Sequence, residues 1–307
     1  MNAVDVVVIG EPLIEISTEG PIAAGIGCAL AVSGDVVNTA AAATAAGARV
    51  ALIARVSDDE LGSAVLSRLE ELGVDLSHVQ RDDAFQGMYV QHSDPLGDRH
   101  FCYARAGSAG SRLSPSDLPA GLLEIAGAVL VSGITAALST TARATVIEAS
   151  RRARRFVYDP NFRPRLTTAG EAAALLVELA PHCALITPSA PHECATLLGV
   201  SEPAEASVRL RRAGAASVAV TCGASGVHVD DGTTHWQPAI PAPLVVDQTG
   251  AGDVFVGTVA ARLALGDGLY PAVQIGAAAS SLAVGAVGGS GGIAPLSIVR
   301  THAGVSA

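Results

Sequence analysis

One segment of the chain combines two glycines with a carboxylate. Gly250 and Gly252 stand where an apolar extended run, residues 243–246, gives way to a small-residue stretch that predicts a helix over residues 251–265. Glycine lets the backbone approach a ligand closely, and the free N–H groups at a helix start suit an anion such as phosphate. Asp253 would lie on the first turn, either as a favourable helix charge or as a general base beside a phosphate site.

This segment, residues 247–255 with the sequence DQTGAGDVF, resembles a signature of the ribokinase-like (PfkB) family of carbohydrate kinases. The resemblance implies that Asp253 is the catalytic base. It also implies that the backbone at Gly250, Ala251 and Gly252 stabilises the charge on the transferred phosphoryl group, with the two glycines beside the nucleotide. A monovalent cation such as K⁺ near this segment is common in that family.

Composition excludes several other classes of protein. All 19 basic residues are arginine. A Walker P-loop, a protein-kinase fold, a Schiff-base aldolase and a pyridoxal-phosphate enzyme each need a lysine, so these four are excluded. The net charge of −10 argues against broad nucleic-acid binding. There is no apolar run of membrane-spanning length and no cleavable leader, and the five scattered cysteines indicate free thiols, so we expect a cytoplasmic protein.

Short apolar runs alternate with helix-like stretches along the 307 residues. The runs predict strands near residues 4–9, 50–54, 128–131, 156–158, 184–187 and 218–221, and the stretches predict helices near residues 36–46, 60–72, 140–152, 170–179, 205–213 and 276–286. Such alternation indicates an α/β fold with a mostly parallel sheet covered on both faces. The resemblance implies one ribokinase-like domain over residues 1–307, with a three-layer α/β/α core.

Two segments, residues 11–33 and 86–106, break this alternation. Their short strands and turns predict a small β-sheet lid inserted into the α/β domain, and ordinary surface hairpins are the alternative. The ribokinase-like family has such a lid over its sugar site. Lid strands often pair between subunits in that family, so we expect a homodimer formed through the lid.

The stretch from Ser33 to Asn38 resembles the Gly-Gly-Asp-x-x-Asn pattern of the same family, with a serine in place of the first glycine. In the family this aspartate grips sugar hydroxyls, and the glycine and asparagine also face the sugar. A carboxylate can accept two hydroxyl hydrogen bonds at once, which suits a polyol. The resemblance therefore assigns Gly34, Asp35 and Asn38 to substrate binding, although Asp35 could instead be only an N-cap.

Two arginines indicate an anionic substrate. Tyr103 and Arg105 alternate on the last lid strand and should share a face, and Arg163 follows a core strand in an Asp-Pro-Asn-x-Arg segment. An arginine fork matches a carboxylate, whereas the alternative is a surface arginine lying over an aromatic ring. These stretches look most like the branch of the family that phosphorylates 2-keto-3-deoxygluconate at its terminal hydroxyl, to the 6-phosphate. That branch adds Tyr89 and Ile134 to the substrate-binding residues.

The nucleotide side carries weaker signals. Ser189 and Glu193 occupy the place of the family's Asn-x-x-Glu segment, so Glu193 is either a Mg²⁺ ligand through water or an exposed residue at a helix start. Thr221, Gly223 and Gly226 resemble a strand-Gly-x-x-Gly turn beside ATP. The expected partners are Mg-ATP and a sugar acid, without nucleic acid or membrane. A fructokinase or ribokinase acting on a neutral sugar, or a non-catalytic sugar-binding regulator, is the alternative.

Overall fold

Nine strands form one sheet in the order β13-β12-β11-β10-β9-β8-β1-β4-β5 in the computed structural model, which describes residues 4–18, 20–93 and 99–305. The strands from β11 to β5 run parallel, and β12 and β13 add an antiparallel hairpin at one edge. The strands are β1 (Val6–Ile9), β4 (Val50–Ser57), β5 (Asp75–Asp82), β8 (Ala128–Ser132), β9 (Phe156–Asp159), β10 (Cys183–Ile186), β11 (Val218–Thr221), β12 (Gly226–Asp230) and β13 (Thr234–Pro238).

Strand β1 shows why an unbroken apolar run fits the middle of this sheet. Val7 and Ile9 pack into the hydrophobic core on one face, whereas Val6 and Val8 pack into the core on the other face. All four side chains are at most 2% exposed. A strand that is covered on both faces needs apolar residues at every position, which is the pattern expected of a parallel sheet.

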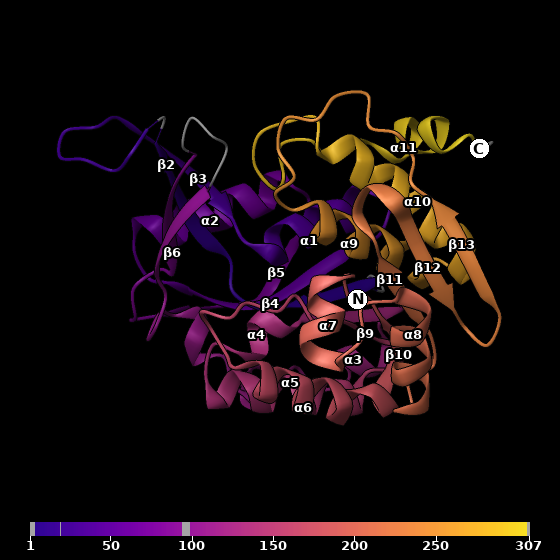
Figure 1. Ribbon diagram of the computed structural model, residues 1–307. Helices are drawn as coiled ribbons and strands as arrows, with labels where there is room; N and C mark the ends of the chain where they lie inside the picture. Colours follow the sequence, from indigo (N-terminus) through magenta and orange to yellow (C-terminus); the bar gives the residue numbers. More distant parts are fainter. Residues whose placement is uncertain (1–3, 19, 94–98, 306–307) are drawn as a thin grey trace.

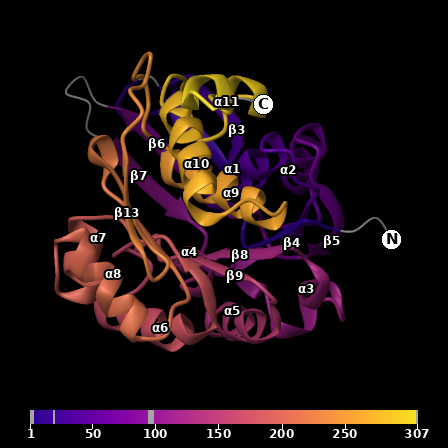
Figure 2. The ribbon, with the colours of Figure 1, turned by 90° about the vertical axis from the view of Figure 1, so that its right-hand side faces the viewer.

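Helices form a layer on each face of the sheet (Figures 1 and 2). One layer contains α1 (Asp35–Ala45), α2 (Glu60–Glu71), α9 (Ala251–Ala264) and α10 (Leu269–Ala283), with α11 (Leu296–Ala303) packed on α10. The other contains α3 (Leu122–Ile125), α5 (Thr140–Arg152), α6 (Ala169–Leu179), α7 (His192–Leu198) and α8 (Pro203–Arg212), and the short α4 (Gly133–Ala136) follows β8. No helix in the described part of the chain is long and apolar enough to cross a membrane.

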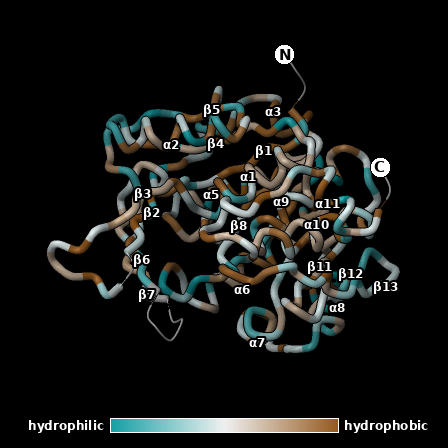
Figure 3. The backbone as a smooth tube through the Cα atoms, turned by 90° about the horizontal axis from the view of Figure 1, so that it is seen from above, coloured by the Kyte–Doolittle hydropathy of each residue, from teal (hydrophilic) through white to brown (hydrophobic). Residues whose placement is uncertain are grey.

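A second, four-stranded sheet has the order β3-β2-β6-β7 and is called the lid below. Its strands are β2 (Leu13–Thr18), β3 (Cys28–Ser33), β6 (Met88–Ser93) and β7 (Arg99–Ala104). Figure 3 shows these strands together at one side of the core. The two segments that break the strand–helix alternation therefore pair with each other, although residues 94–98 of the expected hairpin lie outside the described residues.

The α/β fold with a mostly parallel sheet and a small separate sheet is confirmed, but some elements differ from the predictions. Strand β5 and the β12–β13 hairpin were missed because they lie toward the edges of the sheet and mix polar with apolar residues. Residues 243–246 form no strand. The helix expected to begin at residue 276 begins at Leu269. Pro271 does not prevent this earlier start, because it lies in the first turn, where the N–H group that it lacks would have no partner within the helix.

Helices α1 and α9 approach each other at backbone distance. A Cβ atom on Gly257 of α9 would lie 2.4 Å from the carbonyl oxygen of Thr39 on α1. That distance is shorter than any normal contact, so a side chain at Gly257 would force the helices apart. The N-terminal turns of both helices carry residues of the site described below, and this contact therefore fixes their separation.

We predict that Gly257→Ala destabilises the protein by about 1–3 kcal/mol, because the added methyl group overpacks a rigid backbone contact. Gly170→Ala is the matched control, since Gly170 lies exposed on α6 and a Cβ there would meet nothing within 4 Å. Denaturant unfolding of both variants measures the difference. Equal stabilities for Gly257→Ala and the control would show that the α1–α9 contact is not a tight constraint.

Candidate active site

A cavity of about 890 Å³ lies between the lid and the carboxyl ends of β9 to β11. Tyr89 and Tyr103 of the lid line one wall, while Asp159 at the end of β9 and Thr221 at the end of β11 line another. The N-terminal turns of α1 and α9 complete the lining. This position matches the rule that parallel sheets bind ligands beyond the carboxyl ends of their strands.

Most residues singled out from the sequence line this one cavity. They are the residues predicted to bind the sugar, Gly34, Asp35, Asn38, Tyr89, Tyr103, Arg105, Ile134 and Arg163, those predicted beside the nucleotide or its cation, Ser189, Glu193, Thr221, Gly250 and Gly252, and the predicted base Asp253. Ala251, Gly223 and Gly226 are not among the lining residues. A Cβ on Gly226 would lie 2.2 Å from the carbonyl oxygen of Gln237 on β13, so this glycine is required by the β12–β13 hairpin.

The N-terminus of α9 presents free backbone donors to the cavity. Gly250 is the N-cap in the left-handed conformation, with φ of +77°. Within the described residues, the N–H groups of Gly252 and Asp253 have no hydrogen-bond acceptor. A Cβ on Gly252 would meet nothing within 4 Å, so the space above this turn is open. Two free N–H groups at the positive end of a helix form a suitable site for a phosphate group.

Asp253 is held by two amide side chains from other segments. Asn38 Nδ2 on α1 donates to Asp253 Oδ2 at 2.9 Å, and Asn161 Nδ2 after β9 donates to Oδ1 at 3.3 Å. Burial, followed by the Asp35 carboxylate, raises the pKa of Asp253 to about 7, against the opposing effects of the Asn38 hydrogen bond and Arg163. A carboxyl group with this pKa is suited to accept a proton near neutral pH.

Asn161 was not assigned a role from the sequence. Its φ of +41° is unusual for a residue other than glycine, and asparagine is one of the residues that tolerate this conformation. The Asp-Pro-Asn stretch just after a core strand was the available signal. Because a backbone dihedral angle cannot be read from one sequence, the contact with Asp253 could not be predicted.

Asp35 is not a helix N-cap, so that alternative was wrong. The N-cap of α1 is Gly34, with φ of +113°, and Asp35 is the first residue of the helix. The Asp35 carboxylate accepts a hydrogen bond from the Ser132 hydroxyl at the end of β8. Asp35 therefore lies on the cavity wall with one oxygen engaged, and its charge acts on Asp253.

The lid contributes an aromatic wall. The rings of Tyr89, Phe101 and Tyr103 lie 5.8–6.0 Å apart, and all three line the cavity. The Tyr89 hydroxyl already donates to Glu15 and contacts Ser33 Oγ at 3.0 Å, so Tyr89 offers mainly its ring to a ligand. Phe101 was missed in the sequence, although its spacing of two from Tyr103 on one strand predicts a shared face.

Arg105 was expected on the last lid strand, but β7 ends at Ala104 and Arg105 is the residue that follows it. Its side chain is 7% exposed and forms an ion pair with the buried Glu11, with Nε 2.9 Å and Nη2 2.7 Å from Oε2. The Nη2 contact lacks the angle of a hydrogen bond, so Nη2 has no proper acceptor within the described residues. Burial raises the pKa of Glu11, and Arg105 and Ser108 oppose this rise. Part of the Arg105 charge is therefore already neutralised.

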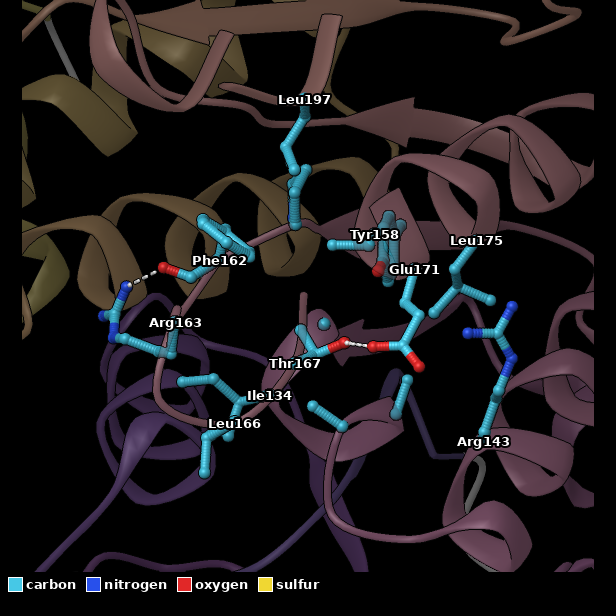
Figure 4. A pocket seen from close by; sticks show the side chains of 15 residues that line it. Ile134, Arg143, Tyr158, Phe162, Arg163, Leu166, Thr167, Glu171, Leu175 and Leu197 are labelled. Carbon is cyan, nitrogen blue, oxygen red and sulfur yellow. Dashed lines mark hydrogen bonds between the residues drawn. The ribbon is translucent and has the colours of Figure 1, made fainter. Parts of the chain in front are cut away.

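Arg163 is exposed and less engaged than Arg105. Among the residues that the structure describes, its Nη1 donates only to the carbonyl oxygen of Phe162, at 3.1 Å. Figure 4 shows this bond among the residues that line a second, small cavity, which include Ile134. The volume of this second cavity is about 20 Å³. Of the two arginines expected near the substrate, Arg163 thus has the more available guanidinium group.

Glu193 links two loops of the site. Its Oε1 accepts the Phe162 N–H at 2.7 Å, and its Oε2 accepts the Ser189 N–H at 2.7 Å. These bonds leave Glu193 to interact with a cation mainly through water. Burial first, and then the charges of Glu193 and Asp253, raise the pKa of Asp159 well above its usual value, so this carboxyl group resists ionisation. No cluster of three or more potential metal ligands occurs in the described ranges.

Comparison with known proteins places this site in a family. The chain matches the pfkB family of carbohydrate kinases over residues 5–295. It is 37% identical over 292 residues to the 2-dehydro-3-deoxygluconokinase of Thermoproteus tenax, covering 93% of this chain and 90% of that protein. It is 30% identical over 251 residues to the 2-dehydro-3-deoxygalactonokinase of Haloferax volcanii, covering 80% and 79%.

The fold agrees with these relatives. A candidate ribokinase II from E. coli, solved in complex with ATP and Mg²⁺, superposes with a TM-score of 0.87 at 24% identity, covering 97% of this chain and 98% of that chain. The protein therefore belongs to the pfkB family of carbohydrate kinases and has a ribokinase-like fold.

We predict an acid limb in the pH profile of the wild-type enzyme, because Asp253 can accept a proton only when it is ionised. With a pKa of about 7, kcat/KM should be level at higher pH and fall about tenfold for each pH unit well below 7. Initial rates of phosphoryl transfer between pH 5 and 9 test this prediction. A profile that stays level down to pH 5 would contradict it.

Proposed function

We propose that the protein is an ATP-dependent sugar-acid kinase that converts 2-dehydro-3-deoxygluconate, also called 2-keto-3-deoxygluconate, into its 6-phosphate. The observation that carries this proposal is the meeting of Asp253, the open N-terminus of α9 and Arg163 around one cavity. A base beside a phosphate site suits transfer to an alcohol, and a cation at the sugar side suits a carboxylate. The identity to the Thermoproteus tenax enzyme supports the same substrate.

The transfer is a direct displacement. The terminal hydroxyl oxygen of the sugar acid forms a bond to the γ-phosphorus of ATP, and the bond from that phosphorus to the bridging oxygen breaks, so ADP leaves. The hydroxyl proton passes to Asp253. The N–H groups of Gly252 and Asp253 stabilise the negative charge on the transferred group. Tyr89, Phe101 and Tyr103 cover the sugar and exclude water, which would otherwise accept the phosphoryl group.

The residues fit Mg-ATP better than free ATP. The carboxyl groups of Asp159 and Glu193 line the nucleotide end of the cavity, and a phosphate group approaches carboxyl groups more favourably with a cation between them. When bound, Mg²⁺ neutralises phosphate charge, and Glu193 would hold its water ligands. Asp247, where a monovalent cation would be expected, accepts the N–H groups of Thr249 and Gly288 at its two oxygens. Asp247 therefore links the Gly288 loop to the turn before α9, and the monovalent cation expected near this segment stays a prediction.

The sugar's stereochemistry is the less specific part of the proposal. The Haloferax volcanii relative is named for the galacto form and the Thermoproteus tenax relative for the gluco form. Both sugars carry a carboxylate and a terminal primary hydroxyl, which are the groups that Arg163 and Asp253 would recognise. We therefore expect turnover of the gluco form and include the galacto form in the substrate panel.

We predict that ADP release with Mg-ATP depends on the keto-deoxy sugar acid and not on fructose or ribose, and that Asp253→Asn abolishes it. Arg163→Ala should raise KM for the sugar acid about tenfold, because a charge-assisted contact with the carboxylate is lost. Arg165→Ala is the matched control, since Arg165 lies on the same loop, does not line the cavity and donates instead to the Phe101 carbonyl oxygen.

Each alternative gives a different result in this assay. Preferred turnover of fructose or ribose, with Arg163→Ala unchanged, would identify a neutral-sugar kinase. Sugar binding by calorimetry without any ADP release would identify a binding protein that does not catalyse transfer. Full activity of Asp253→Asn would show that Asp253 is not the group that accepts the hydroxyl proton.

We further propose that the protein is a homodimer formed through the lid. Strand β3 is an edge strand with a neighbour on one side only among the described strands, and its residues Cys28 to Ala31 are exposed. Leu30 is 56% exposed at the middle of this strand. An exposed apolar edge strand is a natural surface for pairing with a second copy.

Leu30→Lys should therefore shift the protein from dimer to monomer, because a charge is introduced into the apolar contact. Val177→Lys is the matched control, since Val177 is similarly exposed, at 54%, on α6 and far from the lid in sequence. Light scattering coupled to size exclusion measures the mass of each. A monomeric wild type, or a Leu30→Lys variant that remains dimeric, would contradict the proposal.

A further inference from the structure

The Asn38 amide makes an uneven set of contacts. Its Nδ2 donates to Asp253 Oδ2 at 2.9 Å, whereas its Oδ1 is buried and has no donor within the described residues. Only 3% of Asn38 is exposed. An unpaired buried oxygen is unfavourable. The amide orientation is therefore set by the carboxylate, because turning the amide over would bring Oδ1 against the Asp253 oxygen.

A glycine loop packs directly on this amide. A Cβ atom on Gly289 would lie 2.2 Å from Asn38 Nδ2 and 2.5 Å from Asn38 Cγ. A Cβ atom on Gly250 would in turn lie 2.6 Å from the Cα atom of Gly289. The loop, the N-cap of α9 and the Asn38 side chain are thus stacked without room for an additional methyl group.

The same loop is fastened to the phosphate site. Asp247 Oδ2 accepts the Gly288 N–H at 3.0 Å, and Asp247 Oδ1 accepts the Thr249 N–H at 2.7 Å. Thr249 directly precedes the N-cap Gly250. One carboxylate therefore joins the loop that presses on Asn38 to the turn that would hold the phosphate.

We propose that Asn38 is a positioning residue for the base, and that the Gly288–Gly289 loop clamps its amide so that the Asp253 carboxylate is aimed at the substrate hydroxyl. This inference rests on the proposed function, in which Asp253 accepts the hydroxyl proton. It changes the role expected for Asn38 from the sequence, which was to face the sugar.

The charged and polar groups around Asp253 determine the sign of the effect. Burial and Asp35 on α1 oppose ionisation of Asp253, while Arg163 and the amides of Asn38 and Asn161 favour it; Asp159 at the end of β9 has its own pKa raised, in part by Asp253. Removing the Asn38 donor takes away one favourable contact and leaves the burial and the opposing Asp35 carboxylate in place. The pKa of Asp253 must then rise, so a loss of activity at neutral pH should be recovered at alkaline pH.

The test compares pH profiles of the full-length enzyme with Mg-ATP and the keto-deoxy sugar acid. Asn38→Asp keeps the shape of the side chain but replaces the donor by a negative charge, so the acid limb of kcat/KM should move upward by about one pH unit or more. Asn38→Ser and Gly289→Ala should move it in the same direction by less. KM for the sugar should change by less than about threefold, because Asn38 acts through Asp253.

Ser290→Ala is the matched control for the loop. Ser290 adjoins Gly289, and its side chain makes no hydrogen bond within the described residues. Its pH profile should equal that of the wild type. Gly289→Ala also keeps the test informative if the Asn38 variants fail to fold, since it leaves every polar group of the site in place.

Two results separate the inference from the function on which it rests. A raised sugar KM in the Asn38 variants with an unchanged pH profile would overturn the positioning role and identify Asn38 as a sugar ligand. If Asp253→Asn is inactive at the same time, the proposed role of Asp253 as the base still stands. If the enzyme phosphorylates no sugar of the panel, the proposed function fails first. Carboxyl ¹³C NMR titration of Asp253 with and without Asn38 then tests the contact directly, and an unchanged pKa would overturn it.

Discussion

The geometry of the site depends on the backbone contact between α1 and α9. Gly257 lets the two helices approach until a side chain no longer fits, and this separation brings Asn38 within hydrogen-bond distance of Asp253. The parallel sheet beneath directs both helix N-termini to the same edge. A small residue in the middle of a helix, with no chemical role of its own, thus determines the distance between Asp253 and Asn38.

This close approach also raises the pKa of Asp253, because it places two carboxyl groups near each other. Asp35 and Asp253 lie near enough for each charge to oppose the other, and burial adds to the effect, so Asp253 has a pKa of about 7. An isolated surface aspartate would be ionised at neutral pH but would be a weak base. The amides of Asn38 and Asn161 limit the rise and keep the ionised form accessible. The balance between burial, carboxylates and amides therefore sets the pKa of Asp253.

The sequence was sufficient for the alternation of core strands and helices along the chain and for most of the residues around the cavity, because motifs at strand ends and helix starts keep their place in a parallel sheet. It was insufficient where the role of a residue depends on contacts between distant parts of the chain or on a backbone angle. Arg105 could be seen as a cation near the sugar, but its ion pair with Glu11 joins residues 94 positions apart. Asn161 acts through an unusual backbone angle. Gly223 and Gly226 have the spacing of a nucleotide turn, but the close contact of Gly226 with β13 in the adjoining hairpin is sufficient to require a glycine there.

The Glu11–Arg105 pair joins the cavity wall to both ends of the lid. Glu11 lies just before β2, where the chain enters the lid, and Arg105 lies just after β7, where the chain leaves it. Their ion pair ties these two points together in a buried environment, where charges interact strongly. A substrate carboxylate that approached Arg105 would compete with Glu11 for the same guanidinium group. Binding at this residue and the anchoring of the lid therefore depend on one shared charge, whereas Arg163 reaches the cavity from the core alone.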